Sequence, residues 1–220
     1  MIYIVVLNWN GAIDTINCVK SLMNLNYDDY KIIVVDNCST DNSYDSIKEN
    51  LNALYITGKS FIEVKYEDRS KYQTFENDKI ILIQSPKNNG YASGNNIGIE
   101  LALNQEDMKY VWVLNNDTEV DKEALTHLIS KCDSDKNIGI CGSRLVYFTD
   151  REMQQGLGGV HNRWLCTTKN YEMGRLVSKK YDDEVISNNI DYIIGASMFF
   201  SRECLETVEI GRASVGKECR

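Results

Sequence analysis

The chain has 220 residues, of which 43% are hydrophobic and 25% charged, the balance of a soluble globular protein with room for one α/β domain. Its formal net charge of -8 argues against nucleic acid as a partner, because broad affinity for nucleic acid needs lysine and arginine to neutralise phosphates. The seven cysteines are odd in number and never spaced as Cys-x-x-Cys, so they suggest neither a disulfide framework nor a zinc site.

Reduced thiols predict a cytoplasmic protein. No stretch of the sequence reaches the roughly 18 apolar residues of a membrane span. The expected location is therefore the cytoplasm, and a peripheral contact with the inner face of the membrane stays open.

Apolar and amphipathic stretches alternate through the first two thirds of the chain. Strands are predicted at 2–7, 30–35, 80–83, 110–114 and 138–147, and helices at 12–24, 41–51, 93–104 and 121–132. This alternation predicts an α/β fold with a Rossmann-like, mostly parallel sheet flanked by helices on both faces. The first helix is expected to bury one stripe of side chains, made of Ile13, Ile16, Val19, Leu22 and Met23.

We expect one domain over residues 1–208. Within it, residues 52–78 are interpreted as an insertion with short strands at 55–56 and 61–64. Residues 148–189 are polar and aperiodic, which predicts a long loop, and long loops in compact domains are usually functional. A helix is expected to start near Ser201, and residues 209–220 form an atypical tail without periodicity.

Short polar side chains follow four of the predicted strands. In open parallel sheets the carboxyl ends of the strands meet at one edge, and ligands bind there. The clusters together predict a nucleotide pocket, although each alone is also typical of a turn. They are Asn8 and Asn10, then Asp36, Asn37 and Ser39, then Asn88, Asn89 and Gly90, then Asn115, Asn116 and Asp117.

Three residues at this edge have specific expected roles. Asp36 can accept hydrogen bonds from the edge of a base, and Trp9 offers a ring for stacking, with core packing as its alternative. Asp117 can anchor Mg²⁺ or Mn²⁺ on a diphosphate, since such an ion takes one or two protein carboxylates; an Asx turn before the next helix is its alternative. Gly90, Gly94 and Gly98 let backbone approach a ligand or a neighbouring element closely.

Four motifs in this order resemble the family 2 glycosyltransferases of GT-A fold. They are Val5–Gly11, Val34–Asp41, Asn88–Gly98 and Leu114–Thr118, and the resemblance covers residues 1 to about 208. Within that family the sequence is most similar to the rhamnosyltransferase-like enzymes of bacterial cell-surface polysaccharide synthesis. Those enzymes carry an Asn-x-Asp variant of the usual Asp-x-Asp, and Asn115-Asn116-Asp117 keeps only the last carboxylate.

The resemblance implies an inverting, metal-dependent transferase that moves a hexosyl or rhamnosyl group from a UDP- or dTDP-linked sugar to a saccharide or lipid-linked acceptor. Asp117 would hold Mg²⁺ or Mn²⁺. The donor-binding residues would be Asn8, Trp9, Asn10, Asp36, Asn37, Ser39, Asn88, Gly90, Asn95, Asn115, Asn116 and Asp117. The acceptor side would include Gly159, Trp164, Gly195 and Ala196, whereas His161 is interpreted as a surface residue.

The general base of an inverting transferase has no clear counterpart in the sequence. In the family it is an Asp or Glu downstream of the stretch that matches Gly195–Met198, and residues 209–220 do not fit the family pattern. We therefore expect a truncated or altered C-terminus and poor transfer, with Asp191 and Glu203 as the nearest substitutes. Two alternatives stay open: a non-catalytic nucleotide-sugar-binding protein, and a sugar nucleotidyltransferase.

Overall fold

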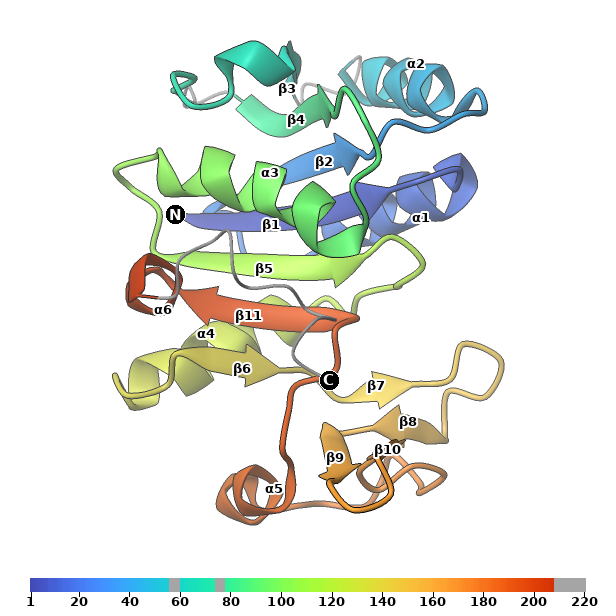
Figure 1. The fold of residues 1–220 in the computed structure, drawn as a ribbon, viewed down its shortest axis with the longest axis vertical. Helices are drawn as coiled ribbons and strands as arrows, with labels where there is room; N and C mark the ends of the chain where they lie inside the picture. Colours follow the sequence, from blue (N-terminus) through green and yellow to red (C-terminus); the bar gives the residue numbers. More distant parts are fainter. Residues whose placement is uncertain (56–59, 74–77, 208–220) are drawn as a thin grey trace.

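A seven-stranded sheet forms the centre of the molecule (Figure 1). The computed structural model describes residues 1–55, 60–73 and 78–207. The sheet order is β3-β4-β2-β1-β5-β11-β6, and all strands run parallel except β11, which is antiparallel to both neighbours. The strands are β1 (Ile2–Asn8), β2 (Tyr30–Asp36), β3 (Ser60–Val64), β4 (Asp78–Gln84), β5 (Tyr110–Asn115), β6 (Ile140–Gly142) and β11 (Ser197–Ser201).

Helices cover both faces of this sheet, as predicted. One face packs against α1 (Ala12–Leu22), α2 (Ser43–Tyr55) and α4 (Ala124–Ser134). The other packs against α3 (Tyr91–Leu103), α6 (Arg202–Thr207) and the short 3₁₀ helix at Tyr66–Asp68. Every residue of β1 and β2 is buried, which explains why their apolar residues show no alternation; Asn8, Lys31 and Asp36 are the buried polar exceptions.

The face of the sheet on which a side chain lies follows from the register of the strands. Ile4, Ile32 and Trp112 are in register and point toward α1 and α4, whereas Val5 and Val113 point toward α3. The alternation continues to the ends of the strands, because successive side chains point to opposite faces. It therefore decides where the polar side chains at the strand ends point.

The prediction of one long loop over residues 148–189 is wrong, because this segment contains short strands and a helix. Residues 143–196, between β6 and β11, form a separate layer that we call the lower lobe (Figure 1). It contains β7 (Leu145–Val146), β8 (Gln154–Gly156), β9 (Gly159–Asn162), β10 (Thr167–Asn170) and α5 (Asp183–Asn189). These two-stranded pairs carry mostly polar or glycine residues, so no apolar period marks them in the sequence. The single strand predicted at 138–147 is accordingly split between β6 and β7.

The predicted buried face of the first helix also needs correction. Ile13 is 76% exposed, because α1 buries the face that carries Thr15, Cys18, Val19 and Leu22 instead. Thr15 can be buried because its hydroxyl donates to Asn8 Oδ1 (2.8 Å), so the polar group keeps a partner.

The segment 52–78 also differs in detail from its predicted strands. Tyr55 ends α2 rather than lying in a strand, and Ile56 lies outside the described residues. The strand at 61–64 exists as β3, at the edge of the main sheet beside β4.

The C-terminal helix begins at Arg202, as expected, and the predicted tail at 209–220 lies outside the described residues. Within the described ranges, none of the helices has the length and apolar character needed to cross a membrane. The six described cysteines are all unpaired, and Cys219 lies outside the described residues.

Candidate functional site

A pocket of about 370 Å³ lies at the carboxyl edge of the sheet, where the N-terminus of α3 meets the ends of β1, β2 and β5. Seven of the residues predicted for the donor site line it, and Leu7 and Tyr91 complete the lining. The lining residues are Leu7, Trp9, Asn37, Asn88, Gly90, Tyr91, Asn115, Asn116 and Asp117. The sequence prediction that separate strand ends converge on one site therefore agrees with the geometry.

Asn8, Asp36 and Ser39 form a buried hydrogen-bond network beside this pocket and do not line it. Asp36 is completely buried, and its Oδ1 accepts from Asn8 Nδ2 (2.7 Å) and from Ser39 Oγ (2.5 Å). Its Oδ2 accepts from the Ser39 amide (3.1 Å) and from Gln84 Nε2 (3.0 Å). The carboxylate that was expected to read a base thus has four donors within the protein and holds the loop after β2 against β1.

Asn10 belongs to the same network. Its backbone is left-handed (φ 53°), its amide donates to Ser39 Oγ (2.9 Å), and its Oδ1 accepts from the Thr40 amide (2.8 Å). Trp9 is next to it and is 55% exposed, which excludes the alternative of core packing. The loop after β1 is therefore fixed by hydrogen bonds while the indole of Trp9 faces the pocket and solvent.

Two buried amide oxygens in the pocket lining have no hydrogen-bond partner among the described residues: Asn37 Oδ1 and Asn115 Oδ1. The other end of the Asn37 amide is held, because Nδ2 donates to Asn88 Oδ1 (3.0 Å) and to Gly90 O (3.3 Å). A buried acceptor without a donor costs about 1–3 kcal/mol. These oxygens are suited to accept N–H or O–H groups of a bound molecule.

Asn95 behaves differently from the other predicted asparagines. It lies inside α3, 4% exposed, and donates to Tyr91 O (3.1 Å). Its Oδ1 is also buried without a partner among the described residues, but Asn95 is not part of the pocket lining. Asn116, which does line the pocket, donates from Nδ2 to Thr15 Oγ1 (3.0 Å) and so holds the turn after β5 against α1.

Tyr91 is a residue of the site that the sequence interpretation missed. Its hydroxyl donates to Gly195 O (2.8 Å) and ties the start of α3 to the segment before β11. Burial raises the pKa of the Tyr91 phenol, the hydrogen bond with Asn95 lowers it, and the nearby charge of Asp117 raises it further. The phenol therefore stays neutral and donates at physiological pH. No local signal identifies Tyr91, because an aromatic residue after a turn glycine is common.

The N-terminus of α3 is open toward the pocket. Gly90 is its N-cap with φ 89°, no side chain caps the helix, and its first turn contains no acidic residue. Nothing lies within 4 Å of the position of a Cβ on Gly90, so the positive φ, rather than crowding, accounts for glycine there. The first amides of a helix carry partial positive charge, which suits them to a phosphate or another anion.

Asp117 is an exposed carboxylate in the pocket lining, and no hydrogen bond or ion pair engages it within the described part of the chain. Among the same residues, no three His, Cys, Asp or Glu side chains gather into a metal-binding group. This donor set fits a phosphate-bound Mg²⁺ or Mn²⁺, because such an ion takes one or two carboxylates and completes its shell with water and phosphate oxygens. Asp117 and phosphate oxygens would then share the ion.

The predicted acceptor-side residues fall into three places. Gly195 and Ala196 lie beside the pocket, since Gly195 O accepts from Tyr91 and Ala196 O accepts from the Asn115 amide (3.1 Å). Gly159 is buried in the lower lobe, where the Tyr192 ring occupies the position of a Cβ. Trp164 is 96% exposed, between β9 and β10.

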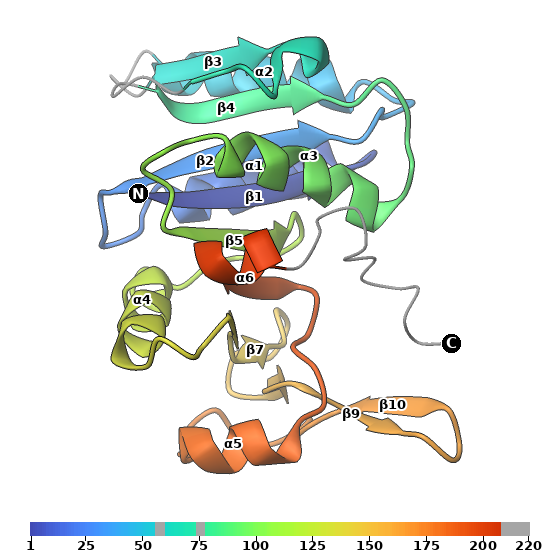
Figure 2. The ribbon, with the colours of Figure 1, turned by 60° about the vertical axis from the view of Figure 1, so that its left-hand side comes forward.

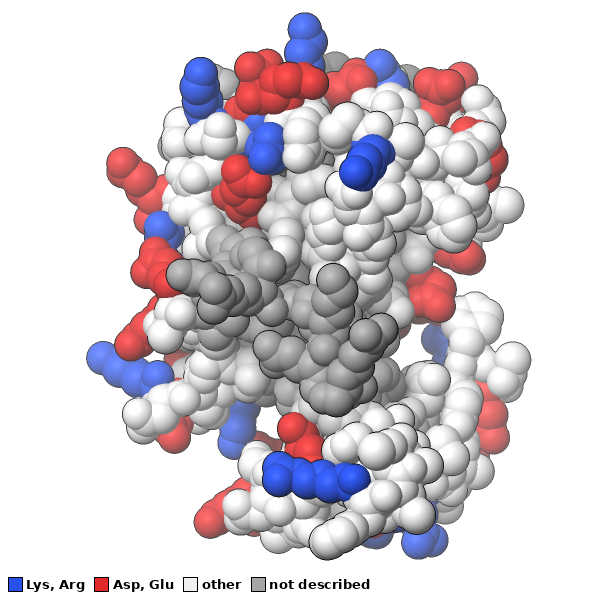
Figure 3. Space-filling view, viewed as in Figure 1, with Lys and Arg blue, Asp and Glu red and all other residues white. Residues whose placement is uncertain are grey.

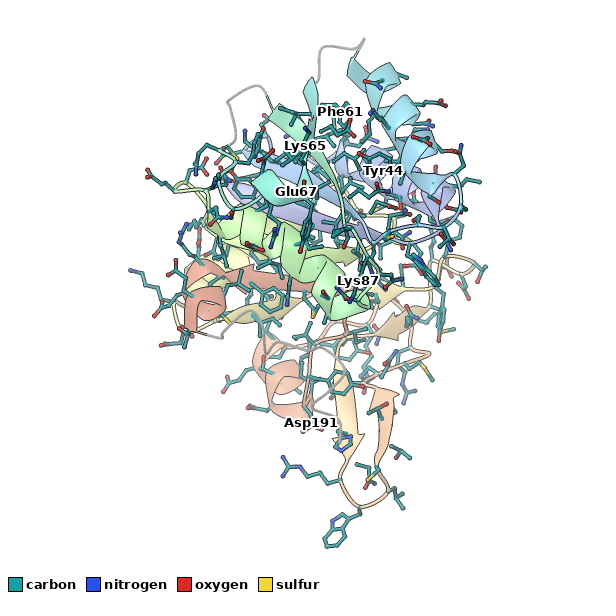
Figure 4. All side chains as sticks on the ribbon, turned by 45° about the horizontal axis from the view of Figure 1, so that its top comes forward. Tyr44, Phe61, Lys65, Glu67, Lys87 and Asp191 are labelled. Atoms are coloured by element: carbon teal, nitrogen blue, oxygen red, sulfur yellow. The ribbon has the colours of Figure 1, made fainter. Side chains whose placement is uncertain are left out.

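Neither substitute for a general base lies in the pocket lining. Glu203 follows β11, whose last residue, Ser201, pairs with Tyr110 at the start of β5, so Glu203 lies at the opposite edge of the sheet. Asp191 accepts from the His161 amide (2.7 Å) in the lower lobe. Figure 4 shows Asp191 beside the β9–β10 hairpin and Lys87 near the N-terminus of α3, in separate parts of the molecule.

Surface charge is mixed on the face that is toward the viewer in Figure 1. Figure 3 shows acidic and basic side chains interspersed there, without a patch of one sign. The net charge of -8 is therefore not concentrated over this face.

Comparison with known proteins identifies the class. The family model described as glycosyl transferase family 2 matches residues 3–208, and the chain belongs to this family. A curated relative is the low-salt glycan biosynthesis hexosyltransferase Agl10 of Haloferax volcanii, 35% identical over 105 residues, which are 46% of this chain and 32% of Agl10.

The solved structure of a mannosyltransferase shows the same fold. The mannosyltransferase PcManGT from Pyrobaculum calidifontis, in complex with GDP-Man and Mn²⁺, superposes with a TM-score of 0.56 at 13% identity, over 94% of this chain and 46% of PcManGT. S. aureus TarS 1–349 matches with a TM-score of 0.46 at 17% identity, over 77% of this chain and 46% of that one. The fold is thus the GT-A fold of glycosyltransferases, and the chain spans less than half the length of these proteins.

Proposed function

We propose that the pocket binds a nucleotide-diphosphate sugar and that the chain serves in transfer of its hexosyl or rhamnosyl group, with inversion, to a saccharide or lipid-linked acceptor. The observation that carries this proposal is the pair of buried, unpartnered oxygens, Asn37 Oδ1 and Asn115 Oδ1, in a pocket that also presents the free carboxylate of Asp117. Membership of glycosyl transferase family 2 supports the reaction class.

The two amide oxygens favour the nucleoside as the group they contact. Each can accept one or two hydrogen bonds, from ribose hydroxyls or from the imide N–H of uracil or thymine. The exposed ring of Trp9 can stack on the base from the open side. We therefore propose a UDP- or dTDP-linked donor. Because PcManGT is described with GDP-Man, the guanine nucleotide is the competing outcome of the test.

Two features can stabilise the diphosphate. Asp117 would hold Mg²⁺ or Mn²⁺, which supplies positive charge for the phosphate oxygens when it is bound. The open N-terminus of α3 directs amides toward the same pocket. Negative charge develops on the diphosphate as the bond to the sugar breaks, so groups that stabilise this charge lower the barrier.

The acceptor proton has no obvious destination among the described residues of the pocket. Asp117 supplies the carboxylate of the lining, and the proposed role on the metal leaves it unsuited as a base. Loss of general-base assistance alone costs about 10² to 10⁴ in rate. We propose that the chain binds the donor and transfers sugar poorly or not at all, and the same observation favours non-catalytic donor binding as the second candidate.

The pathway and location are further parts of the proposal. The name of Agl10 places that relative in glycan biosynthesis, which supports cell-surface polysaccharide synthesis as the process. A lipid-linked acceptor would be met at the cytoplasmic face of the membrane, so we propose that location.

The test is calorimetric titration of the chain with UDP, dTDP and GDP, with and without Mn²⁺. We expect a uridine or thymidine diphosphate to bind more tightly with Mn²⁺, and Asp117→Ala to abolish the effect of the metal. Glu119→Ala is the matched control, because Glu119 is an exposed carboxylate two residues away whose partner is Arg151. Metal-dependent binding that survives in Asp117→Ala would remove Asp117 from the site. An assay of sugar transfer from a donor that binds then distinguishes a slow transferase from a protein that binds the donor without transferring the sugar.

A further inference from the structure

The turn between β9 and β10 exposes two large apolar side chains at its tip. Trp164 is 96% exposed and Leu165 is 71% exposed. We propose that this hairpin, residues 159–170, binds the surface of an anionic lipid bilayer, with Trp164 and Leu165 inserted between the headgroups. This inference depends on the hairpin alone and does not require that the chain be a transferase.

The hairpin holds its tip in one shape. Asn162 Oδ1 accepts hydrogen bonds from the amides of both Trp164 (3.0 Å) and Leu165 (3.0 Å), and Cys166 adopts a left-handed conformation with φ 50°. β9 and β10 pair in antiparallel register from Gly159 with Asn170 to Asn162 with Thr167. Unpaired amides are costly where water is scarce, and at this tip the amides of both apolar residues are already paired.

The charge of the hairpin favours anionic lipid. Arg163 and Lys169 are its charged residues, and residues 159–170 contain no Asp or Glu, in a chain with a net charge of -8. No carboxylate forms an ion pair with either side chain in the part of the chain that the structure describes. A basic side chain near an anionic membrane strengthens binding about fivefold. Arg163 is adjacent to the apolar tip, and Lys169 pairs with Val160 nearer the base of the hairpin. The apolar tip and these basic side chains supply the two kinds of attraction, apolar burial and charge, on which peripheral membrane binding depends.

The shape of the tip favours a bilayer over a protein partner. Figure 2 shows β9 and β10 extending outward from the lower lobe, on the side away from α5, so the tip projects from the molecule. A stable protein interface buries about 800 Å² on each partner, which two side chains at the end of a hairpin do not supply alone. A bilayer has no fixed surface to match, and tryptophan is favoured at its boundary with water because the indole is apolar with one polar N–H.

The hairpin is also connected to the pocket. The His161 amide donates to Asp191 Oδ2 (2.7 Å), and the Gly159 amide donates to Tyr192 O (2.9 Å). The chain then continues to Gly195, whose carbonyl accepts from Tyr91 in the pocket. A hairpin that rests on a membrane would hold the lower lobe, and with it one side of the pocket, near the lipid surface.

The experiment is co-sedimentation of the protein with vesicles of phosphatidylcholine alone and with vesicles of equal parts phosphatidylcholine and phosphatidylglycerol, at low and high salt. We expect binding to the anionic vesicles, weakened by salt. The double substitution Trp164→Ser, Leu165→Ser should weaken it at least about tenfold, and Arg163→Gln, Lys169→Gln about 25-fold at low salt. Ile13→Ser is the matched control, because Ile13 is an apolar side chain 76% exposed on α1; it should bind like the parent.

Fluorescence gives a second measurement. In a Trp9→Phe background the remaining indoles are Trp112, which is buried, and Trp164, so a blue shift on adding anionic vesicles reports on Trp164. Absence of vesicle binding by the parent, equal binding by the Trp164, Leu165 variant, or unchanged emission at saturating lipid would each overturn the proposal. A change of oligomeric state in that variant would point to a second copy instead of lipid and would also overturn it. Nucleotide titration of the Trp164→Ser, Leu165→Ser variant should give the affinity of the parent, because neither residue lines the pocket. Membrane binding and nucleotide binding are thereby tested separately.

Discussion

Substitution of Gly98 by alanine should destabilise the protein, because α3 lies very close to the sheet at this residue. A Cβ on Gly98 would lie 2.6 Å from Val5 Cγ1 and 3.2 Å from Val35 Cγ2. Both valines are completely buried and have little freedom to move. Overpacking of this kind costs about 1–3 kcal/mol, and the higher helix propensity of alanine offsets about 1 kcal/mol.

The expected net loss is at most about 2 kcal/mol, which corresponds to a fall in Tm of up to about 8 °C for a chain of this size. Thermal and urea unfolding measure it. Gly94→Ala is the comparison, since its Cβ would lie 2.5 Å from Leu7 Cδ1, the end of a flexible side chain in the pocket lining. Gly94→Ala should therefore cost less stability than Gly98→Ala, while the displaced Leu7 should reduce nucleotide affinity about fivefold.

The result that would refute this reasoning is a Gly98→Ala variant at least as stable as the parent. It would mean that α3 moves away from β1 at little cost. Equal nucleotide affinity in the two glycine variants would separately contradict the place of Leu7 in the binding pocket.

Two further predictions concern Trp9 and Tyr30. Trp9→Ala should weaken binding of the nucleoside diphosphate about tenfold through lost stacking, with unchanged Tm because Trp9 is 55% exposed; equal affinity by calorimetry would exclude stacking. Burial raises the pKa of the Tyr30 phenol to about 12, so the folded state favours the protonated form. The stability that results is complete below the unfolded pKa near 10 and is lost as pH rises toward 12. Urea midpoints across this window should fall more steeply for the parent than for Tyr30→Phe, and parallel curves would contradict the assignment.

The central sheet could be predicted from the sequence because its strands are buried on both faces. Every side chain of Ile2–Asn8 and Tyr30–Asp36 is buried, so the apolar stretches 2–7 and 32–35 within them mark both strands in the sequence. The lower lobe could not be predicted in this way. Its strands pair in twos, and two of its glycines are buried under single side chains: Gly158 under Ile190 and Gly159 under Tyr192. Contacts between residues about thirty positions apart leave no period in the sequence.

The position of the pocket could also be predicted, but the division of roles within it could not. Asn8 and Asp36 are partners in the register of β1 and β2, so their side chains point to the same face, toward α1, and bind each other. Asn37 is one residue further along, so its side chain points toward α3, where Leu7 and Asn115 also line the pocket in register. One step along the chain separates the carboxylate of Asp36, which fastens two loops, from the amide of Asn37, whose oxygen has no partner among the described residues. Strands that are apolar on both faces show no alternation in their sequence. Which polar side chains at their ends point toward α1, and which line the pocket, is therefore known only once the strands are paired.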